Sequence, residues 1–138
     1  MLLKRNGVRR VQIIPYGVDT VALPELDAKP LGEPLRLVTV SRLAPNKRVD
    51  HALRAVRSLL DRGVAVQLHV VGTGEVQEPL QRLSRELRLD PVVTFTGPLA
   101  EPEKDALLRG AHFLLHTSLR EGWGLNVIEA NALGKPAT

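Results

Sequence analysis

Short apolar runs that end in turn residues alternate along this chain with segments whose apolar residues recur at helical spacing. Residues 35–40 are apolar and β-branched enough for a buried strand, and residues 49–60 carry an apolar stripe typical of a helix. The alternation continues, with strands predicted at 66–71, 92–95 and 112–116, helices at 79–89, 101–109 and 125–133, and an early strand at 11–14. Alternating strands and helices imply parallel strands joined by crossover helices. The predicted fold class is therefore α/β, a Rossmann-like parallel sheet with helices on both faces.

The composition favours one globular domain in a reducing compartment. Of the 138 residues, 43% are hydrophobic, 25% are charged and none is cysteine. The lack of cysteine excludes disulfides, thiolate zinc sites and cysteine nucleophiles. No apolar run reaches the roughly 18 residues of a membrane span, so we expect a cytoplasmic protein. Because aromatic residues make up only 3% and nucleic-acid-binding surfaces join basic stripes to aromatics, we expect no nucleic-acid partner.

The loops after the predicted strands are the places to look for a site, because ligands of such sheets bind outside the carboxyl ends of the strands. The first of these loops reads SRLAPNKR and holds Arg42 and Lys47 just before a helix. Two cations beside a helix N-terminus are suited to a diphosphate. The alternative, that both are solvated surface cations, stays open on position alone.

The second and third loops are rich in glycine. VGTGE contains Gly72 and Gly74, but the dinucleotide fingerprint needs a third glycine where Gln77 stands, so nicotinamide binding is rejected. These glycines permit a tight turn and a close backbone approach by a ligand, or simply end the strand. FTGPL contains Gly97 and Pro98, whose exposed backbone groups could read a base edge, although an ordinary turn is favoured.

The fourth loop reads TSLREGWGLNVIEA and places Glu121 in a loop and Glu129 inside the following helix. Gly122 and Gly124 leave backbone N–H groups uncrowded where that helix starts, which is typical of an anion cradle. Each carboxylate can accept two hydroxyl hydrogen bonds, so the pair suits a polyol such as a sugar or ribose. The alternative is a solvated loop acid and a satisfied helix residue.

Taken in order, these segments resemble the C-terminal, nucleotide-binding half of retaining glycosyltransferases of the GT-B fold, especially family 4, the glycosyl transferases group 1. The resemblance covers nearly the whole chain and rests on the segments IIPYGVD, VSRLAPNK, LHVVGTGE, VTFTGPL and LLHTSLREGWGLNVIEANALGKP. Its most specific element is the pair of glutamates separated by seven residues, which follows the Arg-x4-Lys pair.

The resemblance implies a role for each candidate residue. Arg42 and Lys47 would grip the diphosphate of the donor and neutralise it as it leaves, and Glu121 would bind hydroxyls of the transferred sugar, so these are the catalytic candidates. Glu129 would bind the ribose. The candidates for donor binding are Gly72, Gly74, Gly97, Leu99, Gly122, Trp123, Gly124, Leu125 and Glu129.

The chain departs from the family pattern at a few positions. The family often has glycine where Ser41 and Arg48 stand, proline at Thr117 and phenylalanine at Trp123. The departures at Arg48 and Trp123 bear on the local loop shapes more than on the roles of the residues.

No metal and no cofactor are expected. The sequence has no D-x-D element, and its four histidines show no convincing ligand spacing. His112 and His116 would share a strand face, where packing is a commoner role than metal binding. Arg42, Lys47 and a helix dipole would stabilise the departing diphosphate in place of a metal, and the donor would be linked to UDP or GDP.

The resemblance also implies that neighbouring parts are missing. The parent enzyme would be a retaining hexosyltransferase with an N-terminal acceptor domain, and GKPAT would begin a further strand. Residues 1–20 are interpreted as a remnant of the interdomain linker and 21–138 as an incomplete domain for the donor nucleotide sugar. We expect the chain alone to transfer no sugar and to associate through its truncated edge, and the parent could associate peripherally with a membrane.

Two other functions remain open from the sequence. One is a stand-alone module that binds a nucleotide sugar as a regulatory ligand. The other is a sugar-nucleotide epimerase or a phosphorylase-like relative with the same fold.

Overall fold

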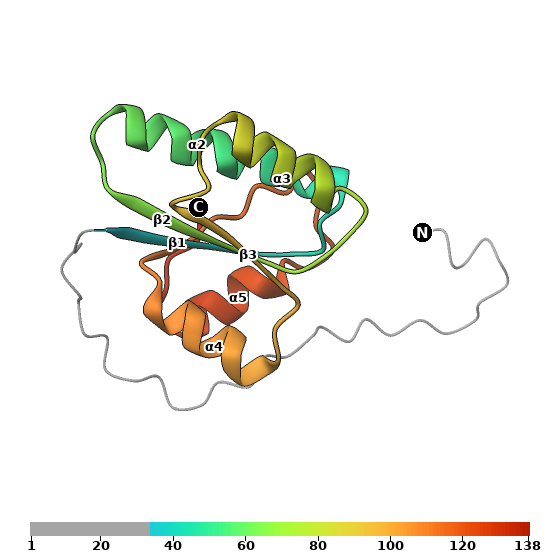
Figure 1. Ribbon diagram of the computed structural model, residues 1–138. Coiled ribbons are helices and arrows are strands. Elements are labelled where there is room, and N and C mark those ends of the chain that lie inside the picture. The colour runs from blue at the N-terminus through green and yellow to red at the C-terminus, as the bar shows by residue number, and fades with distance from the viewer. Residues whose placement is uncertain (1–33) are drawn as a thin grey trace, which may run out of the picture.

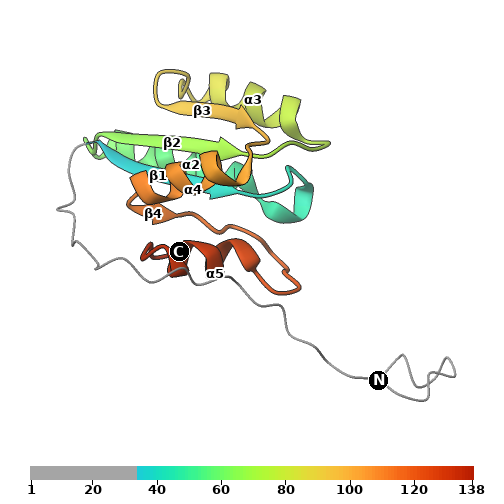
Figure 2. The ribbon, with the colours of Figure 1, turned by 90° about the horizontal axis from the view of Figure 1, so that it is seen from below.

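A parallel sheet of four strands forms the centre of the molecule, in a computed structural model that describes residues 34–138. The strands are β1 (Leu35–Val40), β2 (Val66–Val71), β3 (Val93–Gly97) and β4 (Phe113–Leu114). They lie side by side in the order β3-β2-β1-β4 (Figure 2). Every neighbouring pair is parallel, as expected when each connection passes through a helix.

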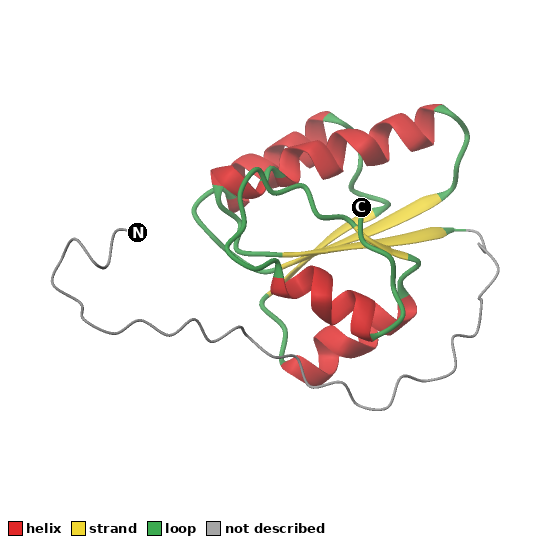
Figure 3. Ribbon diagram, turned by 180° about the vertical axis from the view of Figure 1, so that it is seen from behind, coloured by secondary structure: helices red, strands yellow, loops and turns green. Residues whose placement is uncertain are grey.

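Helices cover both faces of the sheet. Helices α2 (Val49–Asp61) and α3 (Gln77–Glu86) lie on one face, and α4 (Glu101–Gly110) and α5 (Leu125–Ala132) on the other (Figures 1 and 3). A short 3-10 helix, η1 (Pro45–Lys47), precedes α2. The predicted α/β class, with a Rossmann-like parallel sheet between two helical layers, is confirmed.

Two apolar cores fill the space between the sheet and its helices. Strand β1 supplies both, because its Leu37 packs toward α2 and its Val38 toward α4 and α5. The alternation of side chains along a strand gives this two-sided burial. Leu53 and Val56 from α2 are fully buried in the first core, whereas Leu108 from α4 is buried in the second.

The predicted elements are all present within residues 34–138, but some of their bounds differ. Helix α3 begins at Gln77 and not at 79, so Pro79 still falls in its first turn, where it is tolerated. That helix ends at Glu86, shortly before Arg88 adopts a left-handed φ of 55°. Strand β4 is only two residues long, so His116 lies beyond it. The predicted strand at 11–14 and the proposed linker at 1–20 lie outside the described residues.

The last residues of the chain pair with β4. The N–H of Leu114 donates to the carbonyl of Pro136 at 3.0 Å, and the N–H of Thr138 donates to the carbonyl of Leu114 at 2.9 Å. Leu114 and Ala137 form a parallel bridge. Residues 136–138, the end of GKPAT, therefore pair with β4 at the edge of the sheet.

Candidate functional site

The loops that follow the strands meet at one edge of the sheet. Arg42 follows β1, Gly72 follows β2, Gly97 ends β3 and Glu121 comes after β4, and all four strands point the same way. Hydrogen bonds join the loops directly: the N–H of Leu43 donates to the Thr73 carbonyl at 2.9 Å, and the N–H of Gly72 to the Gly97 carbonyl at 2.8 Å. These four residues therefore share one rim, as expected of loops that follow the carboxyl ends of parallel strands.

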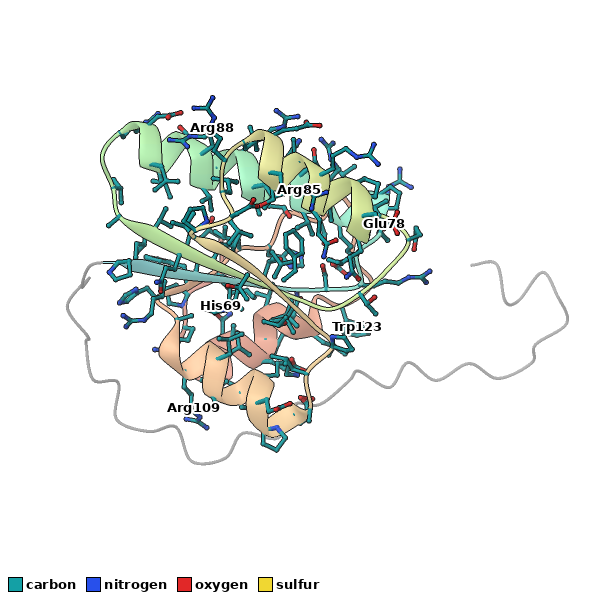
Figure 4. All side chains as sticks on the ribbon, in the orientation of Figure 1. His69, Glu78, Arg85, Arg88, Arg109 and Trp123 are labelled. Carbon is teal, nitrogen blue, oxygen red and sulfur yellow. The ribbon has the colours of Figure 1, made fainter. Side chains whose placement is uncertain are left out.

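A pocket of about 330 Å³ opens on this rim, between the end of β1 and the start of α5. Figure 4 shows Trp123 at this end of the sheet, and its side chain is about half exposed. Most of the lining comes from segments that the sequence predicted for the site: Val40, Ser41, Lys47, Glu121, Trp123, Gly124, Leu125 and Asn126.

Lys47 and Glu121 form an ion pair inside this pocket. The Lys47 Nζ lies 2.5 Å from Glu121 Oε1, and the two side chains are 19% and 25% exposed. Two further contacts hold their loops together. The hydroxyl of Thr117 donates to the Lys47 carbonyl at 2.8 Å, and the N–H of Leu119 donates to the Asn46 carbonyl at 2.9 Å. The structure thus brings together two of the three predicted catalytic residues.

The loop that presents Lys47 turns at Arg48. Arg48 has a φ of 48°, in the left-handed region where glycine is favoured, and its guanidinium makes two hydrogen bonds of 3.0 Å to Asp50. The family pattern described above often has glycine at this position. Arg48 adopts the left-handed conformation that a glycine would adopt there, and from it the side chain pairs with Asp50.

The environment of Glu121 favours its ionised form. Burial by itself raises the pKa of the carboxyl, but hydrogen bonds from Lys47 and Ser118, with the charges of Lys47 and His116, outweigh it and hold the pKa below the ordinary glutamate value. Glu121 is therefore a carboxylate that accepts hydrogen bonds and does not donate a proton near neutral pH.

The lowered pKa of Glu121 predicts a pH-dependent stability. A folded pKa below the unfolded one contributes stability that is present above the unfolded value and is lost as the pH falls through the folded value. Across that acidic window, we expect the free energy of unfolding to fall less steeply for Glu121→Gln than for the unchanged chain. Thermal unfolding at a series of pH values measures this, with Glu86→Gln on the exposed face of α3 as the control. Equal slopes for all three proteins would contradict the prediction.

Arg42 pairs with Glu75 and not with the Lys47–Glu121 pair. Its guanidinium lies 3.0 Å from Glu75 Oε2, its side chain is 73% exposed, and it is not among the residues that line the pocket. Arg42 and Lys47 thus have different acidic partners, and the predicted role of Arg42 on the diphosphate stays a prediction.

Gly72 and Gly74 lie where the loops after β1 and β2 touch. A Cβ on Gly72 would stand 2.0 Å from the Ser41 carbonyl oxygen, and one on Gly74 would stand 2.3 Å from that of Leu43. Gly72 also has a φ of 121°, which side-chain-bearing residues rarely adopt. The close backbone approach predicted here is real, but the neighbour that approaches is the adjoining loop of the same chain.

The remaining candidates for donor binding lie on the loops that follow β3 and β4. Gly124 caps α5 with a left-handed φ of 61°, while Gly122 precedes Trp123 in the loop and does not line the pocket. Gly97 has a φ of 72°, and Leu99 packs against the core between the sheet and helices α4 and α5. Their proposed contacts to a donor stay predictions.

Glu129 is held by a lysine that the sequence analysis missed. The Lys104 Nζ lies 2.9 Å from Glu129 Oε2 and 2.6 Å from Glu101 Oε2, with only 12% of its side chain exposed. Burial by itself lowers the pKa of Lys104, but its hydrogen bonds to the two glutamates outweigh burial and raise that pKa above the ordinary lysine value. Both glutamates of the predicted pair are thus partnered by a lysine.

Asn126 and His116 were also missed. The Asn126 amide donates to the Val40 carbonyl at 2.9 Å, across 86 residues of sequence, and ties the start of α5 to the end of β1. No local pattern marks such a contact, because it depends on how the sheet brings two distant loops together.

Within residues 34–138 no group of histidine and acidic residues could hold a metal ion. His112 accepts a hydrogen bond from the Arg36 backbone N–H at 2.9 Å, and His116 lies 3.1 Å from the Asn126 amide. Among the same residues, no helix has the length and apolar character needed to cross a bilayer.

Comparison with known proteins agrees with the fold and the motifs. Residues 26–137 match the profile of the family described as glycosyl transferases group 1. The chain belongs to this family. Since the match covers most of the sequence, from before β1 to the last residues beside β4, the whole described sheet is group 1 glycosyltransferase sequence.

Curated relatives of the chain carry the names of glycosyltransferases. The chain is 32% identical over 143 residues to the D-inositol 3-phosphate glycosyltransferase of Corynebacterium jeikeium, covering 91% of this chain and 34% of that protein. It is 31% identical over 128 residues to the MMP alpha-(1->4)-mannosyltransferase of Mycolicibacterium hassiacum, covering 92% of this chain and 30% of that protein. The chain spans about a third of the length of the curated relatives it matches.

Solved glycosyltransferases share the fold. A variant of S. aureus TarM in a complex that includes UDP superimposes with a TM-score of 0.80 at 24% identity, covering 99% of this chain and 26% of that one. Anabaena HepE in complex with UDP gives 0.64 at 26% identity, covering 75% and 29%. The parallel sheet described here is therefore the Rossmann-like sheet of GT-B glycosyltransferase structures.

Proposed function

We propose that this chain binds the nucleotide-diphosphate sugar donor of a glycosyltransferase, with the donor lying along the rim that holds Lys47 and Glu121. The observation that carries the proposal is the ion pair of these two residues inside the pocket at the start of α5. One partner is a cation suited to a diphosphate, and the other is a carboxylate suited to sugar hydroxyls.

The diphosphate would lie over the pocket floor, between η1 and α5. Helix α5 has a glycine as its N-cap, which supplies no side-chain acceptor, and the Asn126 amide oxygen accepts from the Val127 N–H in the first turn. The other N–H groups at such a terminus favour an anion. The hydroxyl oxygen of Ser41, which also lines the pocket, is buried and has no hydrogen-bond partner among residues 34–138. A buried hydroxyl without a partner is costly, and a phosphate oxygen could accept its hydrogen bond.

The rest of the donor would follow the rim on either side. Glu121 would accept hydrogen bonds from the transferred sugar and Glu129 from the ribose, while backbone groups from Gly97 to Leu99 would face the base. UDP is the favoured nucleotide because several structural relatives were solved with it, and GDP remains the alternative.

In the full enzyme, cleavage of the bond between sugar and phosphate would leave negative charge on the diphosphate. Lys47 and the N-terminus of α5 would stabilise that charge, with Arg42 joining if it leaves Glu75. We propose that this occurs without a metal and with retention at the sugar carbon. An acceptor-binding domain outside this chain would complete the enzyme, so the chain alone is expected to transfer no sugar.

Binding of UDP without metal tests the proposal. We expect the 138-residue chain to bind UDP in calorimetry, more weakly than a complete enzyme, because loops must be ordered and an opposing domain contributes nothing. EDTA should leave the affinity unchanged. The affinities for GDP and ADP, compared with that for UDP, measure the preference for the base. The affinity for pyrophosphate measures what the nucleoside as a whole contributes. Loss of UDP binding on chelation, or pyrophosphate binding as tightly as every nucleotide, would overturn the proposed donor site.

A further inference from the structure

His116 lies just beyond β4 and outside the pocket lining, and neither the motifs nor the proposed function gives it a role. Its Nδ1 is 3.1 Å from the Asn126 Nδ2, and its Nε2 is 3.6 Å from Glu121 Oε1. His116 therefore stands between the amide at the start of α5 and the carboxylate in the pocket. Only 18% of its side chain is exposed.

Two backbone groups fix the orientation of the Asn126 amide. Its nitrogen faces the Val40 carbonyl at 2.9 Å, and its oxygen faces the backbone N–H of Val127 at 3.0 Å. A carbonyl only accepts and an N–H only donates, so both contacts require the same placement of the amide. The second N–H of the amide is then available to donate to His116.

The Asn126 amide in turn selects the tautomer of His116. An imidazole nitrogen that accepts a hydrogen bond carries no proton, so the neutral ring holds its proton on Nε2. Nε2 is also the ring nitrogen that lies near Glu121 Oε1, the atom that accepts a hydrogen bond from Lys47 at 2.5 Å. At 3.6 Å the imidazole is too far away for a hydrogen bond while the lysine is in place.

We propose that His116 is a positioning residue for Glu121. When a donor diphosphate draws Lys47 away, the Nε2–H of His116 replaces the lysine as a hydrogen-bond donor to Glu121 Oε1. This inference rests on the proposed function of the same site. A diphosphate carries more negative charge than one carboxylate and competes for the ammonium group. Once Lys47 leaves, Glu121 keeps the hydrogen bond from Ser118 but has lost that of the lysine at the moment it must face the sugar. The Nε2–H of His116 closes the gap and keeps the carboxylate oriented, as hydrogen bonds that are long in a free site often tighten in the complex.

The tautomer is tested first, and this test needs no ligand. Nitrogen-15 NMR of the imidazole at a pH where His116 is neutral should show an unprotonated Nδ1 and a protonated Nε2. Adding UDP should shift the Nε2 proton signal as its bond to Glu121 shortens. A proton on Nδ1, or an Nε2 signal that UDP does not move, would overturn the inference.

Two substitutions then separate positioning from packing. His116→Gln can place an amide N–H near the position of Nε2, whereas His116→Asn reaches only the position of Nδ1. The probes are UDP, UDP-glucose and UDP-N-acetylglucosamine, measured by calorimetry on the whole chain. The gain in affinity from the sugar is expected to fall by about three- to tenfold in His116→Asn and to be kept in His116→Gln, because only the latter restores a donor to the carboxylate. Affinity for UDP itself should fall by less in His116→Asn and be kept in His116→Gln, since UDP also draws Lys47 from Glu121 but brings no sugar for the carboxylate to hold.

The outcomes distinguish this inference from the proposed function. If the unchanged chain binds no UDP, both fail. If it binds UDP and neither sugar adds affinity, or if His116→Asn keeps the full gain, only the role of His116 fails. An equal loss in both variants, accompanied by equal losses of thermal stability, would show a packing residue and would also overturn the inference.

Discussion

Replacing Gly72 with alanine is expected to destabilise the fold by about 2 to 6 kcal/mol, from about 1–3 kcal/mol of backbone strain and about 1–3 kcal/mol of overpacking. The new Cβ would stand 2.0 Å from the Ser41 carbonyl oxygen, at a φ of 121° that alanine disfavours. Relief would require the loops after β1 and β2 to separate, although the N–H of Leu43 is bonded there to the Thr73 carbonyl at 2.9 Å. Thermal and denaturant unfolding measure the loss.

Gly110 provides the matched control for Gly72. It ends α4, no atom lies within 4 Å of where its Cβ would be, and its φ is not in the left-handed region. Gly110→Ala should therefore be neutral or slightly stabilising, since alanine has the higher helix propensity. If Gly72→Ala were as stable as Gly110→Ala, the close approach of the two loops would not exist as described.

Replacing Lys47 with alanine is expected to weaken UDP binding by about tenfold to a hundredfold, because a charge-assisted hydrogen bond contributes roughly 1.5 to 3 kcal/mol. Lys47 lines the pocket and already holds a carboxylate there at 2.5 Å, so its ammonium is confined where a diphosphate would lie. Calorimetric titration with UDP and with pyrophosphate should show similar losses, since both ligands carry the diphosphate.

Two other basic residues make the Lys47 result specific. Arg54→Ala removes one positive charge from the exposed face of α2 and should leave binding within about twofold. Arg42→Ala should weaken binding less than Lys47→Ala, because Arg42 is 73% exposed and paired with Glu75 outside the pocket lining. Equal UDP affinities for Lys47→Ala and Arg54→Ala would contradict the proposal that the diphosphate binds in this pocket.

Local pattern was sufficient for much of the fold. Within residues 34–138, apolar periodicity located the four strands and the four α-helices but not the short 3-10 helix η1, because one buried face per element is a property of the local sequence. Alternation of the elements then predicted parallel strands, and parallel strands bring Arg42, Gly72, Gly97 and Glu121 to one edge. The bounds of α3 and β4 were less accurate, because they depend on hydrogen bonds with neighbours that a local pattern does not contain.

The sequence by itself determined the fold class, the common rim and the candidate status of Lys47 and Glu121, since each follows from residue type and position along the chain. Only the tertiary structure decided which groups meet. It pairs Arg42 with Glu75, packs Gly72 against a loop of its own chain and pairs Glu129 with Lys104. It also brings His116 Nε2 to 3.6 Å from Glu121 Oε1. The physical reason is distance along the chain: Lys47 and Glu121 are separated by 74 residues. Contacts over such separations depend on the packing of strands and helices between them, which periodicity and spacing do not encode.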